Sequence, residues 1–385
     1  MIRAGARRAA RAARALRKGI IVACAGAVMA AGPAVAAPRS VQIVVRTAEN
    51  LHSVADVEAL VRWAADSGID TLSVLVKQDE DRSIPSGQVF FASRIAPVAA
   101  GYARFDVLAT LIPLAHARGL RVRAWLPQFH DQVLARAHPE WQMRTVRKGR
   151  VVPFTGSGPG HTEYFVNPLE PGVQDYELSL IREVVSRYAV DGIMLDWLRF
   201  DNFDMDLGDT TRAAFKGESG IDPLTIDFTR DGPARDAWNR FRTDGIARYA
   251  ARVRAAIRPE VSVGAYILPP EFVEVAQDAA RFRGSVGSLA PMCYFGDWGF
   301  PVDWVWTSCL PSVADKAGET AVEPVLGIAY SDAQNRLILA HLDRAGPRVC
   351  GLTWFFHDRW TEARVRQAGA LSREDRPADP QPHAP

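Results

Sequence analysis

The sequence has few cysteines and almost no net charge. Its 385 residues include four cysteines, and 46 Lys or Arg are nearly balanced by 44 Asp or Glu. Cysteine is too scarce for a disulfide-stapled scaffold, and no two cysteines have zinc-finger spacing. The balanced charge gives no basic patch of the kind that nucleic-acid-binding proteins carry, so we expect no nucleic-acid partner.

Metal and nucleotide motifs are also missing. No glycine-rich nucleotide turn follows the first apolar strand pattern. The eight histidines include no close pair with a nearby aspartate at metal-hydrolase spacing, which argues against a metal-dependent esterase or deacetylase. An acidic loop lacks the regular ligand order of a calcium site, so a solvated charge run is expected there (Asp201, Asp204, Asp206, Asp209). We therefore expect neither a metal nor another cofactor.

The first 36 residues form a segment of their own. They contain seven Lys or Arg and no acid, then an apolar run from Gly19 to Ala31, then the small residues Ala34-Val35-Ala36. This order is typical of a secretory signal peptide, and the run is too short to span a membrane. We expect its removal, a secreted or periplasmic protein and no stable membrane insertion. Lipoprotein anchoring at Cys24 is the second-ranked alternative, because residues 21–24 resemble a lipoprotein cleavage site.

Removing residues 1–36 leaves 39 basic and 44 acidic residues, a formal net charge of −5. It also leaves Cys293, Cys309 and Cys350, for which one disulfide and three free thiols are both compatible with the sequence. Residues 372–385 contain four prolines in the last nine positions and are expected to be a disordered tail. The remaining residues, 37–371, are expected to form one domain.

Within this domain, strand and helix patterns alternate. Strands are expected at 41–46, 71–76, 121–126, 193–196, 261–267, 286–294, 322–328 and 349–356. A helix is expected to open at Pro269-Pro270-Glu271. Eight strands alternating with eight helices predict an α/β fold, a (β/α)8 TIM barrel, with an open doubly wound sheet as the alternative. Long connections predict loop insertions after strands 3 and 4, including a hairpin at 142–154 and a flexible loop at 156–160.

The strand at 193–196 carries the main candidate catalytic residue. Asp191-Gly192 is a turn, residues 193–195 are an apolar run, and Asp196 stands where that run ends. In a barrel of parallel strands, side chains at the C-terminal strand ends form the active site. Asp196 is therefore predicted to be catalytic, and a loop-entry aspartate without a chemical role is the alternative.

Glycoside hydrolysis usually needs a second carboxyl group on the other side of the scissile bond. We favour Asp297, which follows strand six, because Tyr294 and Trp298 beside it suit a sugar-binding cleft. Glu271, after strand five, is the other candidate, although an acid is favoured in the first turn of a helix in any case.

Several aromatic and polar residues fall at or near the expected strand ends. Aromatic rings stack on the apolar faces of sugars, and histidines can contact sugar hydroxyls. The predicted substrate-binding residues are Trp125, Gln128, His130, Tyr266, Tyr294, Trp298, Trp354 and His357. Aromatic residues at strand ends belong to the core more often than to a binding surface, so about half of them are expected to be buried.

A series of motifs follows this order along the chain. Trp125 follows a strand, His138-Pro139-Glu140-Trp141 and Val166-Asn167-Pro168 come next, then the stretch from Tyr188 to Asp196, and finally Gly217–Pro223 and Trp238–Arg242. Over residues 41–368 they resemble the bacterial glycosyl-hydrolase-like family ten barrels, and more distantly the hydrolase half of poly-N-acetylglucosamine deacetylases. The resemblance implies a hydrolase class rather than a particular substrate.

One departure from the resemblance concerns the candidate catalytic residue. Family members carry two acidic residues in tandem where this chain has Asp196-Trp197, so a role shared by that pair is expected to be altered. The sequence predicts an exported glycoside hydrolase that cleaves O-glycosyl bonds of an extracellular or periplasmic polysaccharide with paired carboxylates. The alternative is a non-catalytic carbohydrate-binding barrel that has lost one carboxylate.

Overall fold

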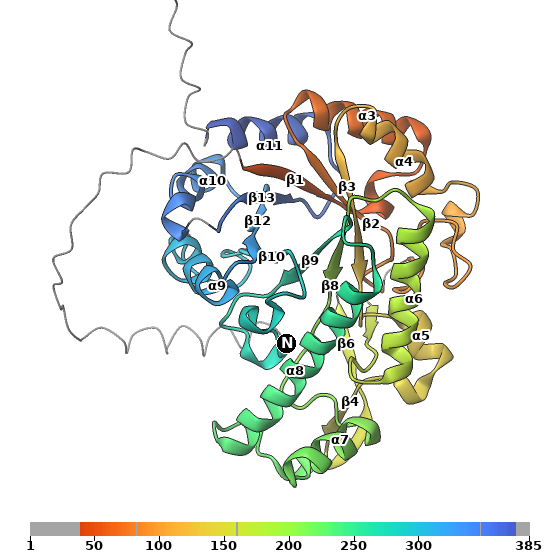
Figure 1. Cartoon of the computed structure of the whole chain (residues 1–385), viewed down its shortest axis with the longest axis vertical. Helices are drawn as coiled ribbons and strands as arrows, with labels where there is room; N and C mark the ends of the chain where they lie inside the picture. Colours follow the sequence, from red (N-terminus) through yellow and green to blue (C-terminus); the bar gives the residue numbers. More distant parts are fainter. Residues whose placement is uncertain (1–38, 82, 159–160, 347, 375–385) are drawn as a thin grey trace, which may run out of the picture.

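A curled sheet of parallel strands forms the centre of the structure (Figure 1). The computed structural model describes residues 39–374 except 82, 159, 160 and 347, so the expected signal segment and most of the expected tail lie outside the described residues. The strands run in the order β11-β10-β9-β8-β3-β2-β1-β13-β12. They are β1 Ser40–Val45, β2 Thr71–Leu75, β3 Arg121–Pro127, β8 Gly192–Asp196, β9 Ser262–Ile267, β10 Ser288–Pro291, β11 Ala321–Val322, β12 Val325–Gly327 and β13 Gly351–Phe355.

The two edges of this sheet belong to one interrupted strand. β11 pairs with β10, β12 pairs with β13, and Glu323 and Pro324 separate β11 from β12. Pro324 has no N–H to donate, which explains the break. Glu323 N still donates to Leu289 O, and Thr353 N donates to Pro324 O, both at 2.9 Å. The described strands thus close a ring of eight positions, which confirms the predicted (β/α)8 barrel.

Helices surround the sheet (Figure 1). They are α2 Thr47–Asn50, α3 Val54–Asp66, α4 Val107–His116, α5 Gln132–Ala137, α6 Pro171–Arg187, α7 Asp209–Ser219, α8 Pro233–Ala256, α9 Leu310–Ala317, α10 Asp332–Leu339 and α11 Glu362–Glu374. Ser53 caps α3 by accepting a hydrogen bond from Asp56 N, and the buried face of α3 is apolar. In the described part of the chain, no helix combines the length and the apolar character that crossing a bilayer requires.

The barrel interior is polar toward the N-terminal ends of the strands. Arg123 on β3 donates to both carboxylate oxygens of Glu323 across the barrel, at 2.6 and 3.1 Å. Farther along the strands, the hydroxyls of Ser73 on β2 and Tyr266 on β9 are hydrogen-bonded at 2.7 Å. These contacts join strands that are not neighbours in the sheet, so they show which alternate residues of each strand point inward.

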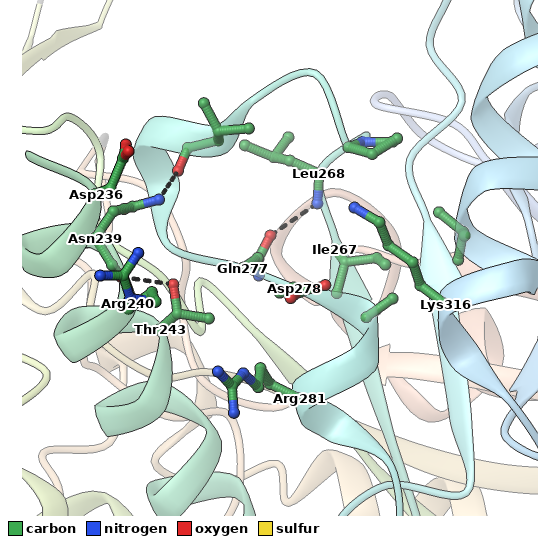
Figure 2. A pocket seen from close by; sticks show the side chains of 14 residues that line it. Asp236, Asn239, Arg240, Thr243, Ile267, Leu268, Gln277, Asp278, Arg281 and Lys316 are labelled. Carbon is green, nitrogen blue, oxygen red and sulfur yellow. Dashed lines mark hydrogen bonds between the residues drawn. The ribbon is translucent and has the colours of Figure 1, made fainter. Parts of the chain in front are cut away.

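The prediction of a helix that begins at Pro269-Pro270-Glu271 is wrong. The chain instead runs through two short 3-10 turns, Val273–Val275 and Ala279–Phe282. The Gln277 side chain holds this segment across the strand ends, because it accepts from Leu268 N at 2.9 Å and donates to Leu198 O at 3.2 Å. A cavity of about 390 Å³ lies between this segment, α8 and α9 (Figure 2). None of the predicted site residues lines that cavity.

Two hairpins follow β3. The first, β4 Arg144–Arg147 with β5 Arg150–Pro153, matches the predicted hairpin. The second, β6 Thr155–Gly158 with β7 His161–Tyr164, shows that the flexible loop predicted at 156–160 was wrong for residues 156–158, which pair as a strand. With α7 and the start of α8, the hairpins form a lobe at the bottom of Figure 1.

The acidic loop after β8, which contains Asp204 and Asp206, is hydrogen-bonded to this lobe. Thr145 donates to Asp204 Oδ2 and Arg144 N donates to Asp206 Oδ1, both at 2.6 Å. Asp206 is buried, and burial raises its pKa to about 6. The predicted solvated charge run is therefore wrong at these positions, since the two carboxylates bind backbone and hydroxyl donors.

At the other end of the chain, α11 continues to Glu374, beyond the predicted start of the tail at Ser372. Ser372 is buried, and its hydroxyl accepts a hydrogen bond from Trp354 Nε1 at 2.9 Å. Ser372 therefore belongs to the folded domain, and residues 375–385 lie outside the described residues.

Candidate active site

Asp196, the last residue of β8, points toward the C-terminal end of the barrel interior. Trp125 Nε1 donates to its Oδ2 at 2.9 Å, and the backbone N–H of Trp197 donates to its Oδ1 at 2.7 Å. The residue is 8% exposed. Burial raises the pKa of Asp196, whereas these hydrogen bonds and the charges of Arg199 and Arg46 oppose that rise.

Asp79 supplies a second buried carboxyl group at this end. It follows β2 and is 4% exposed. Arg46, directly after β1, donates to both oxygens of Asp79, at 2.9 and 3.1 Å. Burial nevertheless raises the pKa of Asp79 to about 6, and the negative charges of Glu80 and Asp196 add to the rise. Two buried carboxyl groups that repel each other in this way favour a state in which one of them keeps its proton.

Arg46 is the main cation of this site. It is 2% exposed and also lies 3.4 Å from Glu49 and 3.3 Å from Glu80. Three carboxyl groups thus share one buried guanidinium, which leaves excess negative charge beside Asp79. This excess disfavours ionisation of Asp79 and so contributes to its raised pKa.

The loop after Asp196 places an aromatic ring where the family resemblance expects a second acid. Trp197 has a left-handed backbone with φ of 48°, a conformation that costs a non-glycine residue about 1–3 kcal/mol. Its ring lies 3.9 Å from the Arg199 guanidinium carbon, and the His130 ring packs against its edge at 4.7 Å. Arg199 is buried and pairs with Asp201 at 3.4 Å. The loop therefore presents a cation and an aromatic face instead of a carboxylate.

Three aromatic residues form a partly exposed surface beside the carboxyl groups. Tyr294 packs at 5.5 Å against both Trp298 and Phe355, and we call these three residues the aromatic platform. Burial, with the charges of Tyr266 and Asp196, raises the pKa of the Tyr294 hydroxyl, so Tyr294 lies within the electrostatic range of Asp196. Side-chain faces of this kind suit the apolar faces of sugar rings.

Comparison with known proteins identifies the family of this chain. The model of the family described as Glycosyl hydrolase-like 10 matches residues 39–281, more than half of the chain. The chain belongs to this family. The resemblance inferred from the motifs is thus confirmed.

Two curated relatives match parts of the glycosyl hydrolase-like 10 barrel. An S-layer-related protein of Niallia circulans is 26% identical over 247 residues, which cover 55% of this chain and 15% of that protein. The glycosyl hydrolase DigH of Escherichia coli strain K12 is 26% identical over 137 residues, which cover 34% of this chain and 30% of DigH. The chain thus spans less than a third of the length of either relative.

Solved structures share the fold at low sequence identity. The glycoside hydrolase domain of PgaB (BpsB) from Bordetella bronchiseptica superposes with a TM-score of 0.68 at 15% identity, covering 89% of this chain and all of that domain. The α-L-fucosidase isoenzyme 2 of Paenibacillus thiaminolyticus gives a TM-score of 0.61 at 17% identity, covering 87% and 49% of the two chains. These likenesses concern the fold alone.

In the described residues, the two predicted partner acids are hydrogen-bonded to groups other than Asp196. Glu271 Oε1 accepts from Trp304 Nε1 at 2.7 Å and from Ser308 at 3.2 Å, on the far side of the loop after β10. Asp297 is exposed and accepts from the Tyr330 hydroxyl at 2.6 Å. Neither carboxylate is bonded to a residue that contacts Asp196. Asp79, in contrast, is a buried carboxyl group whose pKa is affected by the charge of Asp196.

Trp354 was wrongly predicted to bind substrate. It is fully buried and bonded to Ser372 of α11, so it packs between the sheet and that helix. The next residue, Phe355, belongs to the aromatic platform instead and packs against Tyr294. Successive side chains of a strand face opposite sides of the sheet, so the prediction was off by one residue.

Three further predicted ligands lie below the surface. Gln128 is fully buried, donates to Leu126 O at 2.8 Å and accepts from Tyr249 at 2.6 Å. His130 is fully buried, with Nε2 3.2 Å from Asp81. Tyr266 is 3% exposed and sits beneath Trp125, with its hydroxyl bonded to Ser73. All three side chains are thus covered by other parts of the protein and bonded to them.

The remaining predicted residues lie at or near the site. Trp125 is 4% exposed and acts on Asp196 through its indole N–H. Tyr294 and Trp298 belong to the platform. His357 is exposed two residues beyond β13, with its ring 6.3 Å from Phe355. Across the described ranges, no group of three or more His, Cys, Asp or Glu side chains is placed to hold a metal ion.

The predicted site residues did not include Arg46, Asp79, Arg199 and Phe355. Asp79 carried a usable signal, because it follows an expected barrel strand just as Asp196 does. Arg46 stands at the end of the first expected strand. A search for every charged residue at the end of a strand, rather than for acids after strands four to six, would have found both.

Proposed function

We propose that this protein is an exported glycoside hydrolase that cleaves the O-glycosyl bonds of an extracellular or periplasmic polysaccharide, with Asp196 and Asp79 as its paired carboxyl groups. The observation that carries the proposal is that both groups are buried at the C-terminal end of the barrel, where the charge of Asp196 helps to raise the pKa of Asp79 to about 6. Membership of the glycosyl hydrolase-like 10 family supports the reaction class.

The two carboxyl groups have environments that suit different roles. Asp79, with a pKa of about 6, keeps its proton in mildly acidic solution and acts as the general acid that protonates the leaving oxygen. Asp196 receives hydrogen bonds from Trp125 and from the backbone of Trp197, which favour its ionised form. Ionised Asp196 stabilises the positive charge that develops on the sugar ring or attacks it directly. The platform stacks on neighbouring sugar rings.

A non-catalytic carbohydrate-binding barrel is the second candidate function. Trp197 stands where the resemblance expects an acid, and Asp196 and Asp79 are only 8% and 4% exposed. A barrel that kept its platform and lost productive access to the carboxyl groups would bind oligosaccharides without cleaving them.

The deciding experiment measures cleavage and binding separately. The mature protein is incubated with a panel of polysaccharides, and new reducing ends are counted for the wild type, Asp196→Asn and the control Asp297→Asn. We expect Asp196→Asn to fold and to lose activity by about 10²–10⁴-fold or more, and Asp297→Asn to stay close to wild type. Near-full activity of Asp196→Asn would refute its assignment. Wild-type binding without new reducing ends would establish the binding barrel. N-terminal sequencing of the secreted protein should begin at Ala37.

A further inference from the structure

Two buried thiols face each other next to the aromatic platform. Cys293 follows β10 and Cys309 ends the π-helical turn Val305–Cys309, which leads directly into α9. Both residues are fully buried, and their sulfur atoms are 3.6 Å apart. The Cys293 thiol also lies 3.5 Å from the carbonyl oxygen of Pro291.

The two sulfur atoms lie within about 2 Å of bonding distance. A disulfide needs an S–S distance of about 2.0 Å, so rotation of the two side chains must bring the sulfur atoms closer by roughly 1.5 Å. The π-helical turn is closed by a hydrogen bond from Leu310 N to Val305 O. Single π turns are uncommon and often occur at functional positions. Here the turn brings Cys309 to Cys293.

We propose that Cys293 and Cys309 form a disulfide bond in the oxidised protein, whereas Cys350 remains a free thiol. Cys350 is exposed and lies next to the start of β13. The bond forms by exchange with a disulfide oxidant such as oxidised glutathione. One cysteine thiolate attacks the oxidant and displaces one of its sulfurs as a thiolate. The second cysteine thiolate then attacks the mixed disulfide and displaces the other. The two cysteines lose two protons and two electrons, and the oxidant leaves as two thiols.

The timing of this reaction follows from the burial of the pair. Burial and the neighbouring thiol raise the pKa of Cys309, which disfavours the reactive thiolate once the protein has folded. The bond therefore forms during folding, before the segment is enclosed. Once formed, it closes the segment 293–309, which carries Tyr294 and Trp298 of the platform.

The bond also joins the two ends of the loop that carries Tyr294 and Trp298. Trp304 in the same segment donates to Glu271 in the loop after β9, so the two loops are linked. A covalent closure restricts the unfolded chain and stabilises the folded one. The inference concerns thiol chemistry and does not depend on the proposed hydrolase activity.

Peptide mapping tests the proposal directly. The full chain is refolded in a glutathione redox mixture, denatured in the thiol-blocking reagent N-ethylmaleimide without reductant, and digested with trypsin. Residues 284–316 form a single tryptic peptide, because no Lys or Arg lies between Arg283 and Lys316. We expect this peptide to carry no maleimide and to be lighter by two hydrogen atoms than after reduction. The Cys350 peptide should carry maleimide. Labelling of both Cys293 and Cys309 would overturn the proposal.

Matched variants test the structural consequence. A reductant should lower the melting temperature of the refolded wild type by several degrees and should leave Cys309→Ala unchanged. Cys350→Ala is the control and should keep the full sensitivity to reductant. Equal reductant sensitivity in Cys309→Ala and wild type would contradict the proposed bond. Where Cys309→Ala does not fold, the peptide map of the wild type decides alone.

Discussion

Replacing Asp79 by asparagine should remove activity and, at neutral pH, increase stability. Asparagine resembles the protonated form of aspartate in shape and charge. Its oxygen can still accept one of the two hydrogen bonds from Arg46, and its amide NH2 group cannot accept the other. The pKa of Asp79 is about 6 in the folded protein, against an ordinary value of 3.8. A folded pKa above the unfolded one means that ionised Asp79 destabilises the fold, and that this loss develops as the pH rises from about 4 to 6.

The size of the effect follows from the difference in pKa. One pKa unit corresponds to about 1.4 kcal/mol, so ionisation of Asp79 lowers the free energy of unfolding by about 3 kcal/mol once the pH is above 6. Asp79 is 4% exposed, so solvent screening reduces this value little. Asp79→Asn avoids the loss. It should match wild type near pH 4 and exceed its stability by up to about 3 kcal/mol at pH 7.

The activity of the same variant should change in the opposite direction. If Asp79 is the general acid, its removal lowers turnover by about 10²–10⁴-fold. Wild-type activity should also fall as the pH rises through about 6, because Asp79 then loses the proton that it donates. Any residual activity of Asp79→Asn should lack this fall.

The assay combines urea unfolding at pH 4.5 and pH 7 with reducing-end release across the pH range. Asp297→Asn is the control, because Asp297 is exposed and bonded to Tyr330, so both readouts should stay near wild type. A loss of several kcal/mol in Asp79→Asn at pH 7 would show that the ion pair with Arg46 dominates and keeps Asp79 ionised. In that case Asp79 could not serve as the acid.

Two further predictions concern buried groups. Glu177 and Asp131 share the fully buried Lys77, with Lys77 Nζ 2.5 Å from Glu177 Oε1, and burial raises the pKa of Glu177 to about 8. The free energy of unfolding of Glu177→Gln should therefore increase relative to wild type as the pH rises from about 4.5 to 8. Urea unfolding at about pH 4.5 and pH 8 measures this, and the same difference between variant and wild type at both pH values would contradict the prediction. Trp354→Phe should lower the melting temperature without changing turnover, because the indole N–H bonds Ser372 and not the site; a fall in turnover at full stability would refute that placement.

The sequence by itself determined the architecture and the first catalytic candidate. The alternation of apolar strands with amphipathic helices was enough to predict the barrel. The spacing of apolar residues within each segment identifies it as a strand or a helix without knowledge of the rest of the chain. The turn at Asp191-Gly192 and the apolar run after it were enough to place Asp196 at a C-terminal strand end. The hairpin at 142–154 was likewise recognisable, since Lys148-Gly149 marks a turn between short strands.

The tertiary structure alone decided which residues work together. Strands of a barrel are buried on both faces, so neighbouring apolar residues such as Trp354 and Phe355 give no local sign of which one points inward. The pairing of Asp79 with Asp196 depends on β2, β3 and β8 lying side by side in the sheet. The electrostatic interaction between the two carboxyl groups also depends on their burial near Arg46. The fold creates this buried environment from parts of the chain that are far apart in sequence. A pKa shift arises from such neighbours and from lost solvent, and neither is written in the sequence near Asp79.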